Sequence, residues 1–179
     1  MLRRLINFFR SIMFCFKTKN PLKRRPRILG KISLRTKKCH IVLGKNVTIY
    51  PNVVFWGAGT IQIGSNVAIG DNVIILAKKG VFIGNDTMIA ANCYIIDCNH
   101  GTKELDRLMR EQEMDVSEIY IGNNCWVCAG CVIGKGSSLG DGCVVGAMSF
   151  LNNNYSTYSN YIIAGQPAKP IKKRGENCE

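Results

Sequence analysis

The sequence contains no long apolar run. No stretch of its 179 residues reaches the roughly 18 uninterrupted apolar residues that a membrane-spanning helix requires. The basic start is like that of a secretory signal, but Asn7, Arg10 and Ser11 interrupt the apolar stretch, and no small-residue cleavage site follows. We therefore expect an unprocessed cytoplasmic protein.

Acidic residues are absent from the N-terminal segment. Residues 1–40 hold thirteen Lys and Arg and no Asp or Glu, whereas the remaining 139 residues hold eleven Lys and Arg against twelve acids. The total charge of +12 is therefore +13 on this segment and −1 on the rest. Such a segment favours an acidic surface, either anionic lipid or nucleic acid. A solvated basic leader is the alternative.

An apolar residue recurs at intervals of six along most of the chain. The members of this series are Leu43, Ile49, Phe55, Ile63, Ile69, Ile75, Ile83, Ile89, Ile95, Ile121, Val127, Ile133, Leu139, Val145, Leu151 and Ile163. The next position is often Gly, and a small or β-branched residue stands four places after the apolar one. A helix needs a period of 3.6, which this spacing does not sustain, whereas short strands alternate with a period of two.

Each hexapeptide is therefore expected to form one short strand and one corner. Three hexapeptides close a coil of about eighteen residues, and stacked coils bury the apolar column. The sequence predicts an all-β fold, a left-handed parallel β-helix. We expect a basic N-terminal amphipathic helix at residues 1–38, the β-helix at 39–166 with an inserted loop at 97–118, and a short basic C-terminal tail at 167–179.

Nine cysteines raise the question of disulfides or a metal site. Cys93, Cys125, Cys131 and Cys143 occupy the small-residue position of the repeat, where cysteine serves as a small apolar residue. The series Cys125, Cys128 and Cys131 has a spacing like that of an iron–sulfur or zinc motif, but the repeat itself dictates two of its three members. We expect reduced thiols and no metal.

The repeat has one large interruption, between Asp97 and Ile119. The interruption begins Asp97-Cys98-Asn99-His100-Gly101 and continues as a charged stretch. Insertions in a solenoid often carry function, because the scaffold does not need them. We therefore expect this loop to line a cleft beside the prism.

Three motifs together resemble a known family. They are Asp97-x-Asn99-His100-Gly101, Ile121-Gly122-Asn123-Asn124-x-Trp126 and the ending Ala164-Gly165-Gln166-Pro167-Ala168. With the hexapeptide body, they are similar to the galactoside and maltose acetyltransferase superfamily, and most closely to its branch of lipopolysaccharide and capsule O-acetyltransferases. The resemblance implies a homotrimer with acetyl-CoA between neighbouring prisms, and acetylation of a sugar hydroxyl of a cell-surface polysaccharide or its precursor.

The same resemblance assigns roles to individual residues. His100 is the general base that deprotonates the acceptor, a task for which imidazole is suited near neutral pH. Asp97 or a backbone carbonyl fixes its tautomer, and Asn85 and Asn99 lie near the acceptor. For a lone loop histidine, a solvated surface residue is the alternative interpretation.

The resemblance also implies how acetyl-CoA is held. A backbone N–H near Ala129 and Gly130 stabilises the oxyanion, and pantetheine runs along Ala129 and Ala147. Trp126 flanks the groove, although packing at a corner explains it equally well. The phosphates are met by basic residues of the C-terminal segment, which are otherwise a solvated tail: Lys169, Lys172, Lys173 and Arg174.

The N-terminal segment has helical periodicity. An apolar face is formed by Leu2, Leu5, Ile6, Phe9, Ile12, Met13 and Phe16, and Arg3, Arg10 and Lys17 follow at intervals of seven on the other side. This pattern is typical of a helix that lies in a membrane interface, which for a cytoplasmic protein would be the inner face of the cytoplasmic membrane. Packing against a neighbouring subunit is the alternative. Nucleic acid is disfavoured, because the body has no recognition module.

Other functions on this fold remain to be weighed. A γ-type carbonic anhydrase needs three histidines, and the chain has only His40 and His100. A serine acetyltransferase would carry an N-terminal helical domain. An N-acyltransferase acting on an amino sugar and an antibiotic acetyltransferase stay open, as does a non-catalytic β-helical scaffold.

Overall fold

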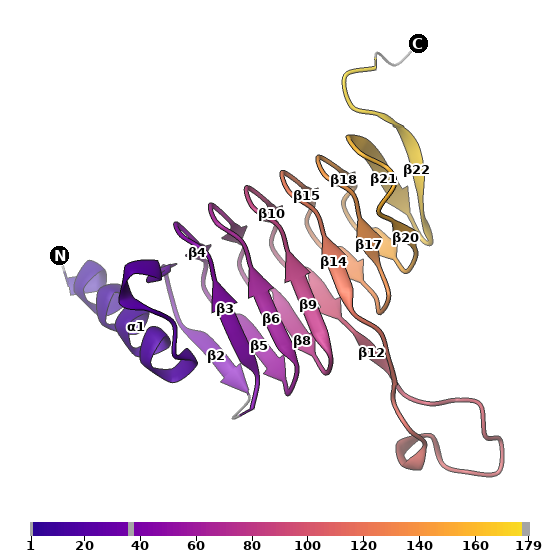
Figure 1. The fold of residues 1–179 in the computed structure, drawn as a ribbon, viewed down its shortest axis with the longest axis horizontal. Coiled ribbons are helices and arrows are strands. Elements are labelled where there is room, and N and C mark those ends of the chain that lie inside the picture. The colour runs from indigo at the N-terminus through magenta and orange to yellow at the C-terminus, as the bar shows by residue number, and fades with distance from the viewer. Residues whose placement is uncertain (1, 36–37, 177–179) are drawn as a thin grey trace.

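The computed structural model describes residues 2–35 and 38–176. Within these residues the chain forms a prism of three parallel sheets, with an α-helix at its N-terminal end and an antiparallel hairpin at its C-terminal end (Figure 1). No helix in this part of the chain is both long and apolar enough to cross a bilayer. The expected fold class, a parallel β-helix preceded by a helix, is confirmed.

The sheets run along the prism, and each coil contributes one strand to each of them. The first sheet contains β1 (Arg27–Ile28), β4 (Thr48–Ile49), β7 (Ala68–Ile69), β10 (Met88–Ile89), β15 (Trp126–Val127), β18 (Val144–Val145), β21 (Tyr161–Gly165) and the antiparallel β22 (Ala168–Lys173). The second contains β2 (Ile32–Arg35), β5 (Val53–Gly57), β8 (Ile74–Ala77), β11 (Tyr94–Ile96), β16 (Val132–Ile133) and β19 (Phe150–Leu151). The third contains β3 (His40–Leu43), β6 (Thr60–Ile63), β9 (Gly80–Ile83), β14 (Ile119–Ile121), β17 (Ser138–Leu139) and β20 (Asn154–Tyr155).

The strand register shows that the coils have two lengths. Thr48 pairs with Ala68 in the next coil, so the N-terminal coils repeat after twenty residues. Trp126 pairs with Val144, so the C-terminal coils repeat after the expected eighteen. The two extra residues of the longer coils lie between the second and third sheets, for example between β8 and β9.

The apolar column fills the prism. Every member of the six-residue series is buried, including Ile69, Ile95 and Ile133, each of which is 0–1% exposed. Cys93, Cys125, Cys131 and Cys143 are buried in the same column as Val67 and Val73. The prediction that cysteine acts there as a small core residue is confirmed.

Asparagine stabilises the corners. Asn52, Asn72 and Asn92 all have φ near +60°, and their side chains form a ladder from coil to coil with N–O distances of 3.0–3.1 Å. Asparagine tolerates this left-handed conformation because its short polar side chain bonds locally. At Gly84 a Cβ would lie 2.6 Å from the backbone carbonyl carbon of Gly122, so the coils approach too closely there for a side chain.

Each end of the prism is covered. Helix α1 (Leu2–Thr18), followed by the short η1 (Leu22–Arg24), packs Phe14 against Phe55 with ring centroids 6.0 Å apart. At the other end, β22 pairs antiparallel with β21, and the Tyr155 hydroxyl donates to the Ala168 carbonyl over 2.9 Å. The segment expected to be a basic tail therefore includes an ordered strand.

Candidate active site

The inserted loop leaves the corner between the second and third sheets. A small antiparallel pair, β12 (Cys98–Asn99) and β13 (Asp115–Val116), forms its base, and the loop then extends away from the prism (Figure 1). The Lys135 ammonium lies 2.8 Å from the Asp115 carboxylate, which ties β13 to the following coil. This ion pair lowers the pKa of Asp115 through the hydrogen bond from Lys135.

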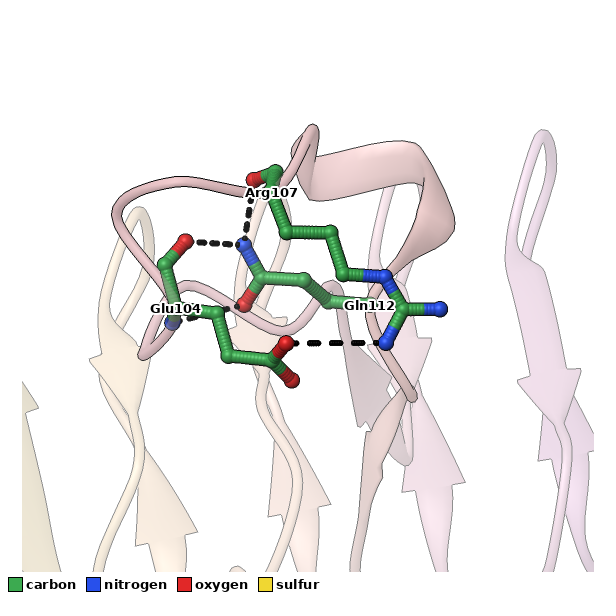
Figure 2. A network of polar contacts seen from close by, with 3 residues as sticks. All are labelled: Glu104, Arg107 and Gln112. Atoms are coloured by element: carbon green, nitrogen blue, oxygen red, sulfur yellow. Dashed lines mark hydrogen bonds and ion pairs between the residues drawn. The ribbon is translucent and has the colours of Figure 1, made fainter.

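The distal part of the loop contains the short helix η2 (Met109–Glu111), and a network of polar contacts lies beside this helix (Figure 2). Gln112, only 7% exposed, donates to the carbonyls of Glu104 and Arg107 over 2.7 and 2.9 Å. Its carbonyl accepts the Glu104 N–H over 3.1 Å, and Arg107 pairs with the Glu104 carboxylate at 3.5 Å. The loop is thus organised around one buried glutamine, a role that the sequence analysis missed because the stretch resembles a solvated charged segment.

Asp97 is completely buried where the loop begins. Its carboxylate accepts three backbone N–H groups of the preceding coil, from Lys78 at 2.7 Å, Lys79 at 2.7 Å and Gly80 at 2.8 Å. These bonds explain the burial, because a buried carboxylate requires partners. Among the described residues Asp97 makes no hydrogen bond to His100, so these bonds give Asp97 a structural role, and its expected role in orienting the base stays a prediction.

His100 follows β12 directly and is exposed. It lines a pocket of about 480 Å³ together with loop residues that include Lys103, Arg107, Glu113 and Asp115. Asn99 is also exposed, and it pairs with Asp115 across the base of the loop. An exposed imidazole beside acidic and basic side chains is able to accept a proton from a hydroxyl that enters this pocket.

Asn85 lies at a different corner, which joins the third sheet to the first. Its side-chain oxygen accepts the Ser65 N–H over 2.8 Å, and its own N–H donates to Asn123 over 2.8 Å. Asn85 is therefore part of a ladder between coils. Within one chain this ladder and the His100 loop occupy separate edges of the prism.

The residues expected along the pantetheine lie at the third corner, between the first and second sheets. Ala129 and Ala147 are exposed and stacked, because the Met148 N–H donates to the Ala129 carbonyl over 3.0 Å. The Gly130 N–H already donates to Ala91 over 3.0 Å, whereas no described residue accepts from the Ala129 N–H. If this corner supplies an oxyanion donor, the Ala129 N–H is the group available.

Trp126 and the basic residues belong to the first sheet. Trp126 is 46% exposed and lies between Met88 and Val144 on neighbouring strands. Lys169, Lys172 and Lys173 lie on β22, at the C-terminal end of the same sheet. The first sheet thus extends from Trp126 to an edge strand that carries three lysines, and the positive charge of this edge would attract an anionic group.

The candidate residues therefore divide among three edges of one prism. His100 and Asn99 stand at one corner, Asn85 at the second, and Ala129, Gly130 and Ala147 at the third. In the part of the chain that the structure describes, no group of three or more His, Cys, Asp or Glu residues could hold a metal, and none of the eight cysteines in that part forms a disulfide.

Comparisons with known proteins agree with this architecture. The family model described as bacterial transferase hexapeptide (six repeats) matches residues 118–153, and the one described as hexapeptide repeat of succinyl-transferase matches residues 60–96. A probable acetyltransferase of Mycobacterium tuberculosis is 30% identical over 82 residues, which are 46% of this chain and 27% of that protein. The putative lipopolysaccharide biosynthesis O-acetyl transferase WbbJ of Escherichia coli is 36% identical over 91 residues, covering 47% and 45% of the two chains.

Among solved structures, the fold resembles AntD, an N-acyltransferase from Bacillus cereus in complex with dTDP and 3-hydroxybutyryl-CoA. The TM-score is 0.75 at 18% identity, over 92% of this chain and 88% of AntD. The chain spans between about a quarter and a half of the two curated relatives. The repeat, its matched segments and these relatives lead to one conclusion: residues 60–96 and 118–153 are transferase-type hexapeptide repeats, and the chain is similar to hexapeptide-repeat acetyltransferases.

Proposed function

We propose that the protein is an acetyl-CoA-dependent O-acetyltransferase that acts on a sugar hydroxyl of a cell-surface polysaccharide or its precursor. The observation that carries this proposal is the position of His100, exposed in a pocket of about 480 Å³ at the base of the inserted loop. The likeness to WbbJ supports a glycan hydroxyl as the acceptor. Acetyl-CoA as the donor favours a cytoplasmic location, which stays a prediction.

The reaction needs one base and one oxyanion donor. A ring nitrogen of His100 takes the proton of the acceptor hydroxyl while the hydroxyl oxygen attacks the thioester carbonyl. The tetrahedral intermediate collapses with cleavage of the C–S bond, and the imidazolium returns the proton to the CoA thiolate. The Ala129 N–H is the candidate donor to the oxyanion. The products are the acetylated sugar and free CoA.

This proposal includes a homotrimer. In one chain the second sheet separates the His100 loop from the corner that carries Ala129 and Ala147. A neighbouring copy, related by cyclic symmetry, would bring its own corner to the loop. The cleft would then combine the general base, His100, of one subunit with the corner of the next subunit, along which the pantetheine would run. Lys169, Lys172 and Lys173 would lie towards the phosphates of CoA.

An N-acyltransferase acting on an amino sugar is the second candidate. It is supported by the likeness to AntD, of which one structure contains dTDP with 3-hydroxybutyryl-CoA and another contains a dTDP-linked amino sugar with CoA. The same histidine would then accept a proton from an ammonium or amine. The two candidates differ in the acceptor alone, so a direct comparison of acceptors separates them.

The experiment is transfer of radiolabelled acetyl from acetyl-CoA to deacetylated cell-surface glycans and, separately, to nucleotide-linked amino sugars. We expect label on the glycan as a base-labile ester. The His100→Asn variant should lose about 10²- to 10⁴-fold in turnover, because it removes the general base. His40→Asn, at the other, exposed histidine, is the matched control and should keep full activity. Label only on the amine supports the second candidate, and no transfer to either class contradicts both.

A further inference from the structure

Helix α1 presents its apolar side away from the protein. Ser11, Phe14 and Cys15 form the buried side, which rests on the first coil. At about 100° per residue, the opposite side carries a row that we call the outer stripe. The outer stripe consists of Leu2, Leu5, Phe9, Met13 and Phe16, which are 71%, 54%, 55%, 55% and 72% exposed.

This orientation is the reverse of that of an ordinary surface helix, which turns its apolar stripe to the core. Of the apolar side chains of α1, only Phe14 and Cys15 are buried against the body of the protein, whereas the longer row faces outward. Isolated exposed apolar residues need no explanation, but a contiguous row about 20 Å long marks a contact surface. Because α1 lies across the N-terminal end of the prism, the outer stripe faces away from that end (Figure 1).

Cations surround the outer stripe. Arg3, Arg10 and Lys17 follow one edge of α1 at intervals of seven residues, which places them on one side of the helix. The basic η1 comes next in the chain, and the guanidinium of Arg25 lies 4.2 Å from the centre of the Phe8 ring. This contact holds the basic segment after α1 against the helix, so that both belong to one surface.

The charge of the chain is separated along the prism. Residues 1–70 hold fourteen Lys and Arg and no acid, whereas residues 71–179 hold ten Lys and Arg against twelve acids. Coils stack in chain order, so this separation in sequence is also a separation in space. The N-terminal end is strongly positive, and the rest is close to neutral.

We propose that the outer stripe docks on the surface of an anionic phospholipid bilayer, with α1 lying in the interface. Such a surface supplies both an apolar layer for the stripe and negative headgroups for the flanking cations. A second copy docked through the same face would bring two strongly positive ends together. Nucleic acid would match the charge but would leave the apolar row in water. The proposal is independent of acetyl transfer, and it would place the prism end-on to a membrane.

The test is co-sedimentation of the full-length protein with vesicles of phosphatidylcholine alone and with vesicles in which phosphatidylglycerol replaces part of it. We expect binding only to the anionic vesicles, weakened by salt. Phe9→Ser combined with Phe16→Ser should reduce that binding about tenfold or more, because both rings would leave the apolar layer. The matched control is Leu105→Ser with Met109→Ser, at exposed apolar residues of the inserted loop, and it should bind as the wild type does.

Both stripe residues are exposed, so the double variant should fold, and the triple variant Arg3→Gln, Arg10→Gln and Lys17→Gln tests the charge separately. The triple variant should bind anionic vesicles more weakly and with less dependence on salt. Equal binding to both vesicle types, or unchanged binding by either variant, would overturn the proposal. A smaller oligomer in the double variant, measured by sedimentation velocity, would also overturn it, because the stripe would then be a subunit contact. Acetyl transfer by the variants in solution is expected to be unchanged, so a failure here leaves the proposed function testable on its own.

Discussion

At the residue scale, Asp97 holds the chain where the solenoid gives way to the inserted loop. Its buried carboxylate binds the backbone N–H groups of Lys78, Lys79 and Gly80 in the preceding coil. Charged acceptors form stronger hydrogen bonds than neutral ones, and a buried donor that loses its partner carries the full cost of desolvation. Asp97 thereby fixes the starting point of the segment that carries His100.

Asp97→Ala should lower the free energy of unfolding by roughly 3 kcal/mol or more, because three buried N–H groups would lose their acceptor. The measurement is denaturant unfolding, compared with Asp106→Ala in the exposed part of the loop, which should change little. A folded, stable Asp97→Ala protein that has lost only turnover would instead support Asp97 as a partner of His100.

A second residue-scale prediction concerns the cysteines of the core. Cys143 is fully buried in a position of the repeat that Val67 and Val73 fill in other coils. Cys143→Val should therefore change the free energy of unfolding by less than about 1.5 kcal/mol, as similar-sized apolar replacements do. Ile133→Ala, in the apolar position of the repeat, should cost about 2–5 kcal/mol because it leaves a cavity. Thermal or denaturant unfolding of the two variants checks the contrast; a large loss in Cys143→Val would mean that the thiol has a specific role.

At the scale of elements, the ion pair between Asp115 and Lys135 joins the loop to the prism. The hydrogen bond from Lys135 lowers the pKa of Asp115. A carboxyl group with a lowered folded-state pKa stabilises the fold above its ordinary pKa, and this contribution disappears as the pH falls through the folded-state value. The anchoring of the loop should therefore weaken in acid.

Lys135→Met should return the pKa of Asp115 towards the ordinary value of an aspartate, because the donor and its charge are both removed. The measurement is a titration of the Asp115 side-chain carbonyl carbon by NMR in the wild type and the variant. Lys45→Met, in an N-terminal coil, serves as the control and should leave the titration unchanged. An identical Asp115 midpoint in the Lys135→Met protein would show that the ion pair is absent in solution.

The elements were predictable from the sequence to different degrees. The repeat predicted the prism, its inward column and the place of the inserted loop, because each coil repeats the same requirement for inside and outside positions. The bonds of Asp97 were not predictable, because its partners lie 17–19 residues earlier and only the stacking of coils brings them together. The pattern of α1 likewise indicated an amphipathic helix, but only the structure shows that Ser11, Phe14 and Cys15 face the body. Local periodicity does not predict the role of a residue when that role depends on contacts between segments that are far apart in the sequence.

At the scale of the whole molecule, the proposed function requires a cleft between two subunits. A His100→Asn chain and an Ala147→Trp chain should each form trimers without activity, since one lacks the base and the other blocks the exposed corner. Trimers assembled from an equal mixture should recover activity at about a quarter of their sites, where a normal loop meets a normal neighbouring corner. The measurement is acetyl transfer after the two chains are denatured and refolded together. No recovery would place the base and the corner in the same subunit.

The measurement that tests the central claim most directly is calorimetric titration of the purified protein with acetyl-CoA, because it requires no knowledge of the acceptor. We predict binding at about one site per chain, since a cyclic trimer has as many interfaces as subunits. His100→Asn should keep this binding, because the base acts on the acceptor, whereas Ala147→Trp should abolish it. Absence of binding by the folded wild-type protein would contradict the acetyltransferase assignment and favour a non-catalytic β-helical scaffold.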